Sequence, residues 1–182
     1  MRSLALALLV AAACLSSGCL VVTLQPLYTD GSLQVDQGLL GTWDSQELGA
    51  TVVVEQGEWK AYQIAYKSKA ASYALVGYLT LIGGATYLDL TPARSLEEGP
   101  LMIPAHGICR LERAGDRLTL TALDYDWFVA TLAARKLGKV DASLDSRKNV
   151  LLTSATEAVR AWLAARPAQA DAFREPVAFV RK

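Results

Sequence analysis

Leu39-Leu40-Gly41-Thr42-Trp43 is the first convincing strand start of the chain. A β-branched run follows from Thr51 to Glu55, and the stretch from Trp59 to Tyr66 alternates, with Tyr62, Ile64 and Tyr66 on one face and Lys60 sharing it at the end. A period of two places one set of side chains on a buried face of a strand and the other set toward solvent. Gln56-Gly57 separates the two runs as a turn signal. The stretch therefore predicts antiparallel strands joined by a hairpin.

Two further hairpins continue the predicted sheet. The run from Tyr73 to Ile82 is apolar on both alternating faces, which is typical of a strand that is covered on both sides. Gly83-Gly84 is a hairpin turn signal between this run and a partner strand from Thr86 to Leu90. The stretch from His106 to Arg113 is expected to pair in the same way with Leu118 to Leu123.

The sequence period changes to that of a helix near Trp127. Asp124 or Asp126 is the expected N-cap. Ser154-Ala155-Thr156-Glu157 predicts a capping box at the start of a second helix, and Val177 to Val180 predicts a last strand. The predicted fold class is mainly β with minor α: an antiparallel sheet of roughly seven to nine strands, closed or strongly curled into a barrel, with one or two C-terminal helices.

The first 18 residues have the anatomy of a secretory signal peptide. Arg2 supplies a positive charge, and the apolar run from Leu4 to Leu15 is too short for a permanent membrane anchor, which needs about 20 residues. Leu15-Ser16-Ser17-Gly18-Cys19 resembles the bacterial lipobox, in which the cysteine receives a diacylglyceride and becomes the first mature residue. Cys14 is a weaker alternative lipidation site, and an ordinary cleaved signal peptide is the other alternative.

Lipidation of Cys19 would define the domains and the location of the mature protein. We expect a signal peptide over 1–18, a lipidated tether over 19–35 that docks on the sheet, and one lipocalin-like β domain over 36–182. Lipid on Cys19 would anchor the protein to a membrane of the bacterial cell envelope, and two or more acyl chains make such an anchor stable. Leu20 stands where an aspartate retains many enteric lipoproteins in the inner membrane, so the outer membrane is favoured.

The charge and cysteine content of the sequence limit the binding partners and the disulfide bonds that we expect. The 182-residue chain has 18 basic and 18 acidic side chains, and loss of Arg2 with the leader leaves one more acidic than basic. No run of basic residues predicts nucleic acid as a partner. Of the three cysteines, Cys14 leaves with the leader and Cys19 carries lipid, so Cys109 stands alone without a disulfide partner. Its place in an alternating strand predicts a buried, inert thiol.

Two resemblances follow from these motifs. Gly41-Thr42-Trp43 is similar to the first barrel strand of lipocalins, in which the tryptophan plugs the closed end and a late arginine covers it. Leu123-Asp124-Tyr125 matches part of the lipocalin Thr-Asp-Tyr motif, and the sequence assigns no single arginine to the covering role. A longer series of motifs resembles a family of uncharacterised bacterial lipoproteins, which implies a location and a single-domain fold but no catalytic residue: Pro26-Leu27-Tyr28-Thr29, Leu39-Leu40-Gly41-Thr42-Trp43, Tyr87-Leu88-Asp89-Leu90, Ile103-Pro104-Ala105-His106, Leu123-Asp124-Tyr125-Asp126-Trp127 and Leu152-Thr153-Ser154-Ala155-Thr156-Glu157.

Few residues suggest catalysis. His106 is the only histidine and the first candidate for acid–base or metal chemistry; the alternative is a structural histidine bonded to a neighbouring carbonyl. Zinc would need several His, Cys or carboxylate ligands, which the sequence lacks. Asp124 and Asp126 have the chemistry for acid–base work or calcium binding, although capping the following helix explains them more simply. No nucleophile elbow, phosphate loop or zinc-protease motif occurs, so no enzyme activity, metal or cofactor is predicted.

Two non-enzymatic functions remain. The first is a binding module that holds an apolar or amphipathic small molecule in a barrel, since tyrosine combines apolar area with a polar handle. The second is a structural or accessory envelope lipoprotein that contacts an unidentified protein. An interior of several hundred Å³ favours the first, and a filled barrel contradicts it. The predicted lining residues, which are also suited to a dry core, are Trp59, Tyr62, Tyr66, Tyr73 and Tyr78.

Overall fold

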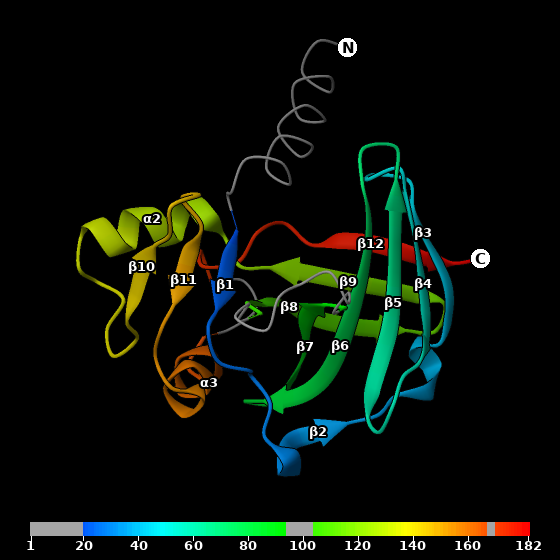
Figure 1. The fold of residues 1–182 in the computed structure, drawn as a ribbon, viewed down its shortest axis with the longest axis horizontal. Coiled ribbons are helices and arrows are strands. Elements are labelled where there is room, and N and C mark those ends of the chain that lie inside the picture. The colour runs from blue at the N-terminus through cyan, green and yellow to red at the C-terminus, as the bar shows by residue number, and fades with distance from the viewer. Residues whose placement is uncertain (1–19, 94–103, 167–169) are drawn as a thin grey trace.

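The computed structural model describes residues 20–93, 104–166 and 170–182 (Figure 1). The predicted signal peptide and the lipidation of Cys19 lie outside the described residues. So does most of the polar loop that follows Pro92.

Eight antiparallel strands of the described residues close into a barrel (Figure 1). Seven of them form a meander in which each strand pairs with the next, and the last strand of the chain closes the barrel between β9 and β3. This confirms the predicted mainly β, lipocalin-like closed sheet. The barrel strands are β3 (Gly41–Ser45), β4 (Ala50–Gln56), β5 (Ala61–Ser68), β6 (Ser72–Ile82), β7 (Ala85–Pro92), β8 (His106–Ala114), β9 (Arg117–Ala122) and β12 (Val177–Arg181).

The hairpin between β6 and β7 shows how the local sequence sets the strand pairing. Gly83 and Gly84 have φ of 58° and 81°, the left-handed conformation that a two-residue hairpin turn requires and that glycine adopts without strain. Ile82 consequently lies opposite Ala85, and the pairing continues along the strands.

One expectation for β6 is wrong. Leu79, Thr80 and Ile82 are buried, but Tyr73 and Leu81 are 41% and 42% exposed. Both share the inner-facing side of Leu75 and Leu79 but lie near the two ends of an 11-residue strand, beyond the part that faces the inner cluster. The strand is therefore covered on both faces over part of its length only.

A second layer packs against the outside of the barrel. β1 (Val21–Thr23) continues the sheet from β8, and β11 (Val150–Leu152) pairs with it in parallel. β10 (Ala142–Leu144) forms the sheet edge, and β2 (Leu33–Gln34) pairs with β6. These short strands bring the described sheet to 12 strands, not roughly seven to nine, because the expected tether itself supplies two of them.

Two α-helices cover this second layer. α2 (Tyr125–Ala133) starts as predicted, with the Asp124 carboxylate accepting a hydrogen bond from the Trp127 amide at 2.7 Å. The capping box predicted for α3 (Thr156–Ala164) is wrong, since the N-cap residue is Ala155. The Ser154 hydroxyl is engaged elsewhere, accepting from the Asp141 amide at 2.7 Å. Two 3₁₀ turns, Asp30–Ser32 and Gln37–Leu39, complete the described helical elements.

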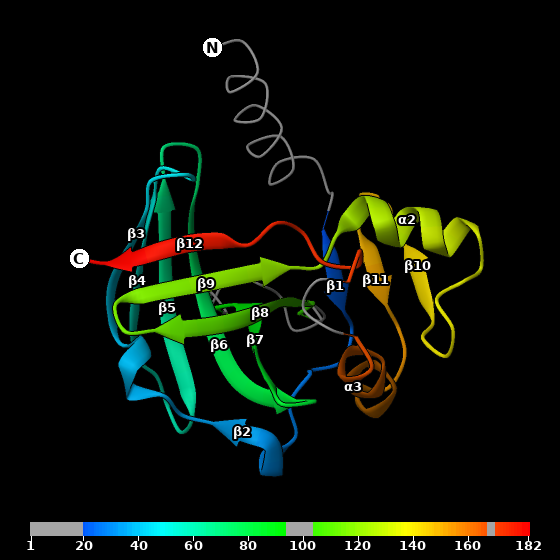
Figure 2. The ribbon, with the colours of Figure 1, turned by 180° about the vertical axis from the view of Figure 1, so that it is seen from behind.

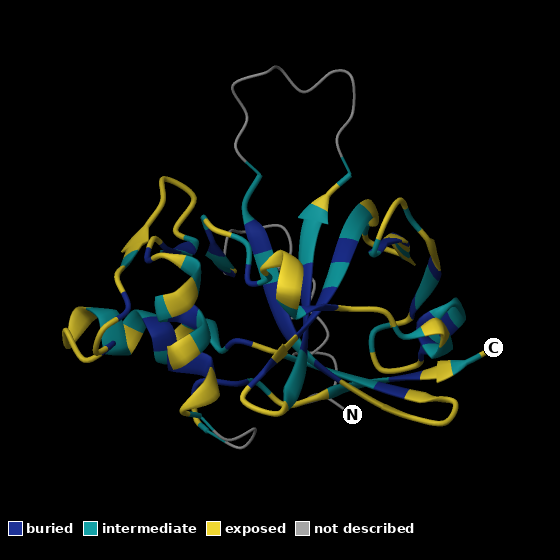
Figure 3. Ribbon diagram, turned by 90° about the horizontal axis from the view of Figure 1, so that it is seen from below, coloured by how far each residue is buried: buried dark blue, intermediate teal, exposed yellow. Residues whose placement is uncertain are grey.

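The described residues form two hydrophobic clusters, one on each face of the barrel wall. The inner cluster lies inside the barrel and includes Trp43, Leu111 and Phe179. The outer cluster lies between the wall and the helices and includes Phe128 and Leu163. Figure 3 shows buried segments gathered in the interior and exposed segments on the outer loops.

Candidate functional site

One end of the barrel is closed by Trp43. Its side chain is fully buried, and its indole Nε1 donates to the Leu39 carbonyl at 2.8 Å. The Arg181 guanidinium lies over the ring at 4.3 Å from the centroid, a cation–π geometry. Arg181 also donates to the Leu40 carbonyl at 2.7 Å and to the Asp116 carboxylate at 3.0 Å. We call these residues, together with Gly41, the closed-end latch.

Gly41 is required in the latch for two reasons. Its φ of 127° lies in a region that side chains rarely adopt. A Cβ at this position would also come within 2.7 Å of the Arg181 guanidinium. The arginine that sequence reasoning left unassigned is therefore Arg181, which the antiparallel pairing of β12 and β3 places opposite Trp43. Its position at the end of the last apolar strand was the available signal.

A cavity of about 440 Å³ fills the rest of the barrel interior. The Tyr62 ring contributes to its wall, but the Tyr62 hydroxyl is satisfied outside, accepting from the Asp36 amide at 2.7 Å and donating to the Asp36 carbonyl at 3.2 Å. Most of the remaining wall is aliphatic, and its branched side chains come from seven different strands: Val52, Val54, Ile64, Leu75, Leu88, Leu90, Leu111, Leu118, Leu120 and Val177.

The polar lining residues lie at the opposite end, which forms the mouth. Glu47 and Leu48 belong to the β3–β4 turn, and Arg174 and Glu175 immediately precede β12. The Arg174 guanidinium lies 3.7 Å from the Asp124 carboxylate. Leu20, the first described residue, also lines the cavity. The site is thus an apolar chamber with one sealed end and a mixed-charge mouth.

The structure brings only some of the predicted aromatic residues together. Tyr62 and Tyr66 line the cavity. Trp59 is 63% exposed, because β5 begins at Ala61 and leaves Trp59 in the preceding turn. Tyr73 lies at the rim with its ring 5.9 Å from that of Tyr66. Tyr78 stacks on Tyr28 on the outer face at 4.4 Å, so these three residues do not belong to the cavity wall.

Sequence reasoning missed the aliphatic wall. The signal was present in pairs of apolar residues two positions apart, such as Leu88 and Leu90 or Leu118 and Leu120. Such spacing directs both side chains of a pair to one face. Strand alternation alone did not show whether that face encloses a space or a solid core.

His106 belongs to a buried pair outside the barrel. Its Nδ1 lies 2.7 Å from an oxygen of Asp89, which is fully buried. The other oxygen of Asp89 accepts from the Leu27 amide at 2.7 Å. The expected carbonyl partner of His106 is therefore wrong, because a carboxylate occupies that position. The pair joins β7, β8 and the N-terminal segment, which is a structural arrangement.

The remaining polar candidates also have structural positions. Asp124 caps α2, and Trp127 packs against Phe128 with ring centroids 5.1 Å apart. Cys109 is buried and unpaired, and burial raises the pKa of its thiol to about 12, so it is a poor nucleophile. Within residues 20–93, 104–166 and 170–182, no three His, Cys, Asp or Glu side chains converge as metal ligands.

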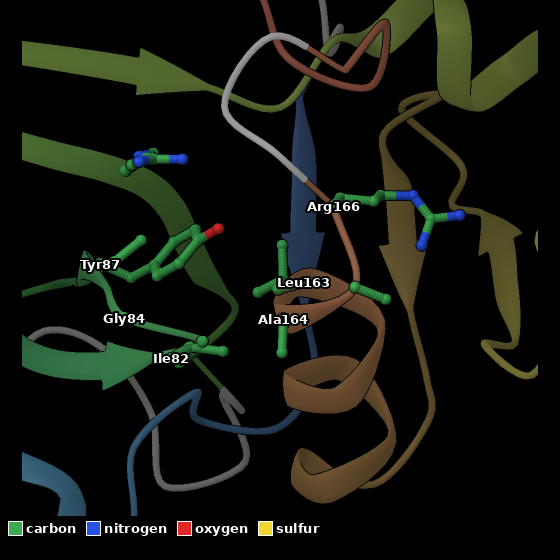
Figure 4. A pocket seen from close by; sticks show the side chains of 10 residues that line it. Ile82, Gly84, Tyr87, Leu163, Ala164 and Arg166 are labelled. Carbon is green, nitrogen blue, oxygen red and sulfur yellow. The ribbon is translucent and has the colours of Figure 1, made fainter.

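A second, more polar pocket of about 380 Å³ lies between the β6–β7 turn and the end of α3. Figure 4 shows Tyr87 pointing from the barrel wall toward Leu163, whereas Arg166 is directed away. The Arg166 guanidinium stacks on Trp162 at 3.6 Å from the ring centroid.

Comparison with protein-family models, curated proteins and solved structures found no match to the chain. In the described part of the chain, no helix is both long and apolar enough to span a membrane.

Proposed function

We propose that this protein is a lipid-anchored component of the bacterial envelope that binds an apolar or amphipathic small molecule inside its barrel. The observation that carries the proposal is the cavity of about 440 Å³ with its aliphatic wall. Ligand pockets in proteins span about 300–1,000 Å³ and are lined mainly by apolar side chains. A chamber of this kind supports ligand binding more directly than a purely structural role.

The arrangement of polar groups supports an apolar ligand. At the closed end, the Trp43 indole and the Tyr62 hydroxyl already have partners within the protein. A ligand in the chamber therefore gains by leaving water, at roughly 25 cal/mol per Å² of apolar surface. The charged residues at the mouth leave room for a polar end of the ligand to stay hydrated.

The proposed anchor fits the position of the mouth. Leu20 lines the mouth and directly follows Cys19. Lipid on Cys19 would hold the mouth close to the bilayer, so that ligands of membrane origin enter over a short path. We propose the outer membrane as its location, because the residue that follows Cys19 is Leu20 and not an aspartate.

Binding is tested with two neighbouring valines of β4. Val52 lines the cavity and Val53 does not. Val52→Trp should place a bulky ring inside the chamber and strongly weaken binding of a fluorescent fatty-acid analogue, whereas Val53→Trp should bind as the wild type does. Native mass spectrometry after mild extraction should also find a ligand on the wild type. Repeated recovery of ligand-free protein that does not bind the probe would overturn the proposal.

The anchor has a separate test. Cells that produce the wild-type chain should incorporate labelled palmitate into it, and a Cys19→Ala variant should not be labelled. Labelling that persists in Cys19→Ala would refute lipidation at this residue, and the binding result would stand independently.

A further inference from the structure

A second apolar cavity adjoins the mouth of the barrel. Its volume is about 640 Å³, and Leu20, Leu75 and Leu90 line both cavities. The outer cavity continues along the second layer, where Val22 and Leu151 contribute to its wall. Shared wall residues on two strands and on the N-terminal segment mean that the two spaces are immediate neighbours.

Along one of its edges, β8 pairs with two different strands, and this explains why the two cavities meet. Cys109 of β8 pairs with Ala122 of β9, but Gly107 pairs with Val22 of β1. Near the mouth, β1 thus replaces β9 as the strand that pairs with this edge of β8. Figure 2 shows the end of β9 beside β1 at this point. The barrel wall divides here into the closing strands and the second layer.

The register carries the inner face of the barrel outward across this division. Leu90 lies opposite Gly107, Gly107 lies opposite Val22, and Val22 lies opposite Leu151. Residues directly opposite one another in a sheet point to the same face. The lining of the chamber therefore continues along β1 and β11, while the other face of these strands is buried against the helices.

Gly107 lies at the junction and has no side chain to divide it. An added Cβ would find its nearest neighbours at 3.7 and 3.8 Å, both in Leu90, which is ordinary contact. A larger residue at this position is therefore compatible with the backbone, and its side chain would extend into the connection between the two cavities.

One side of the outer cavity contains an exposed cation, Arg147, on the segment whose Asn149 side chain accepts a hydrogen bond from the Leu20 amide at 3.3 Å. Asp145 accepts hydrogen bonds from the amides of Arg147 and Asn149 at 2.8 Å and from the Asn149 side chain at 2.9 Å. These bonds, that of the Asn149 side chain first, hold the pKa of Asp145 below its usual value, with the Arg147 charge as a minor cause. The Arg147 side chain is exposed and lines the same cavity as Asp145.

We propose that the two cavities form one site for an elongated single-chain amphiphile with an anionic head. The tail occupies the barrel, the chain crosses the junction at Gly107 and follows β1, and the head lies by Arg147. This inference rests on the proposed function and specifies its ligand class. The charge of Arg147 and the continuity of the apolar face together distinguish such a ligand from a compact apolar molecule.

The chain-length dependence of binding tests the continuous site. The protein is residues 19–182 with Cys19→Ser, because both hydrophobic clusters and all described strands lie within 20–182. Straight-chain alkyl sulfates of increasing length compete with a fluorescent probe for the wild type and for Gly107→Leu. Affinity should rise about fourfold for each methylene buried. For Gly107→Leu, the affinity should stop rising at the chain length that fills the barrel cavity. For the wild type, it should continue to rise beyond that length. Short chains should bind both proteins equally.

The head is tested by Arg147→Gln, which should weaken binding of the longest alkyl sulfate about tenfold and leave the alcohol of equal length unchanged. Equal effects on both probes would overturn the anionic head. Levelling off at the same length in wild type and Gly107→Leu would overturn the continuous site but not the proposed function. Failure of every chain to bind the wild type would overturn the proposed function itself.

The lipid of the protein's own anchor is a different occupant. Lipidated full-length protein that excludes the probe, compared with Cys19→Ser protein that binds it, would assign the site to the anchor and overturn the proposal of a free amphiphile.

Discussion

The two hydrophobic clusters lie on opposite faces of the same strands, yet one is filled and the other is hollow. In the outer cluster, aromatic rings fill the space, with Phe128 and Trp162 centred 5.3 Å apart. In the inner cluster, aliphatic side chains surround about 440 Å³ of open volume. We therefore expect the outer cluster to contribute more to the stability of the fold, and the inner cluster to be open to a ligand.

Matched leucine truncations test this division with the largest expected effect. Leu152 of β11 and Leu111 of β8 are both buried, in the outer and inner clusters respectively. Leu152→Ala should destabilise the protein by about 4 kcal/mol, because it leaves a void in a filled core. Leu111→Ala should cost about 2 kcal/mol, since its side chain already borders open space and has fewer neighbours to lose. Urea denaturation measures both, and equal costs would contradict the comparison.

The same division explains which parts of the fold were predictable from sequence. β5 shows period-two alternation over most of its eight residues, and β4 contains a β-branched run; both are local signals. β1 has three residues and pairs with Val150 to Leu152, far along the chain. No local pattern specifies such a partner.

The site was less predictable, for a related reason. Arg181 reaches Trp43 only because the barrel closes in one register, and closure is a property of the whole sheet. Trp59 has the residue type expected of a ligand site but lies in a turn. Residue chemistry thus indicated an apolar interior, but only the closed sheet determines which side chains enclose it.

A buried polar pair also distinguishes the outer region. Asp89→Ala would leave the Leu27 amide and the His106 ring without their buried partner, and we expect a cost of about 3 kcal/mol. Limited proteolysis should also cut the N-terminal segment sooner, because Asp89 holds it to β7. Glu58→Ala, at an exposed turn, should change the stability by less than about 0.5 kcal/mol. Similar small effects of both substitutions would show that the pair does not stabilise the outer region.

The closed-end latch should respond by a smaller amount. Gly41→Ala combines backbone strain with a clash against Arg181, and we expect a loss of about 2 kcal/mol. Gly115→Ala is the control, because its φ of 58° is also left-handed but no atom lies within 4 Å of the added Cβ; it should cost about 1 kcal/mol.

Removing Arg181 separates the two contributions at Gly41. In an Arg181→Ala background the clash disappears, and Gly41→Ala should cost no more than Gly115→Ala does. Thermal denaturation of the single and double variants gives the coupling free energy. Additive costs would mean that Gly41 is required for its φ alone and not for the approach of Arg181.

Cys109 should have no ionisation effect on stability at neutral pH, and its effect appears only at alkaline pH. Burial, and secondarily the charge of Asp89, raises the pKa of its thiol from 9.0 to about 12. Because the folded-state pKa is the higher one, raising the pH above 9.0 ionises the thiol first in the unfolded chain. The stabilising contribution is complete below that pH and is lost as the pH approaches 12. Cys109→Ala should therefore show a shallower decrease in stability between pH 9 and 11 than the wild type, measured by urea denaturation at each pH. Parallel curves would contradict the raised pKa and would mean that water in the chamber reaches the Cys109 thiol in the folded protein.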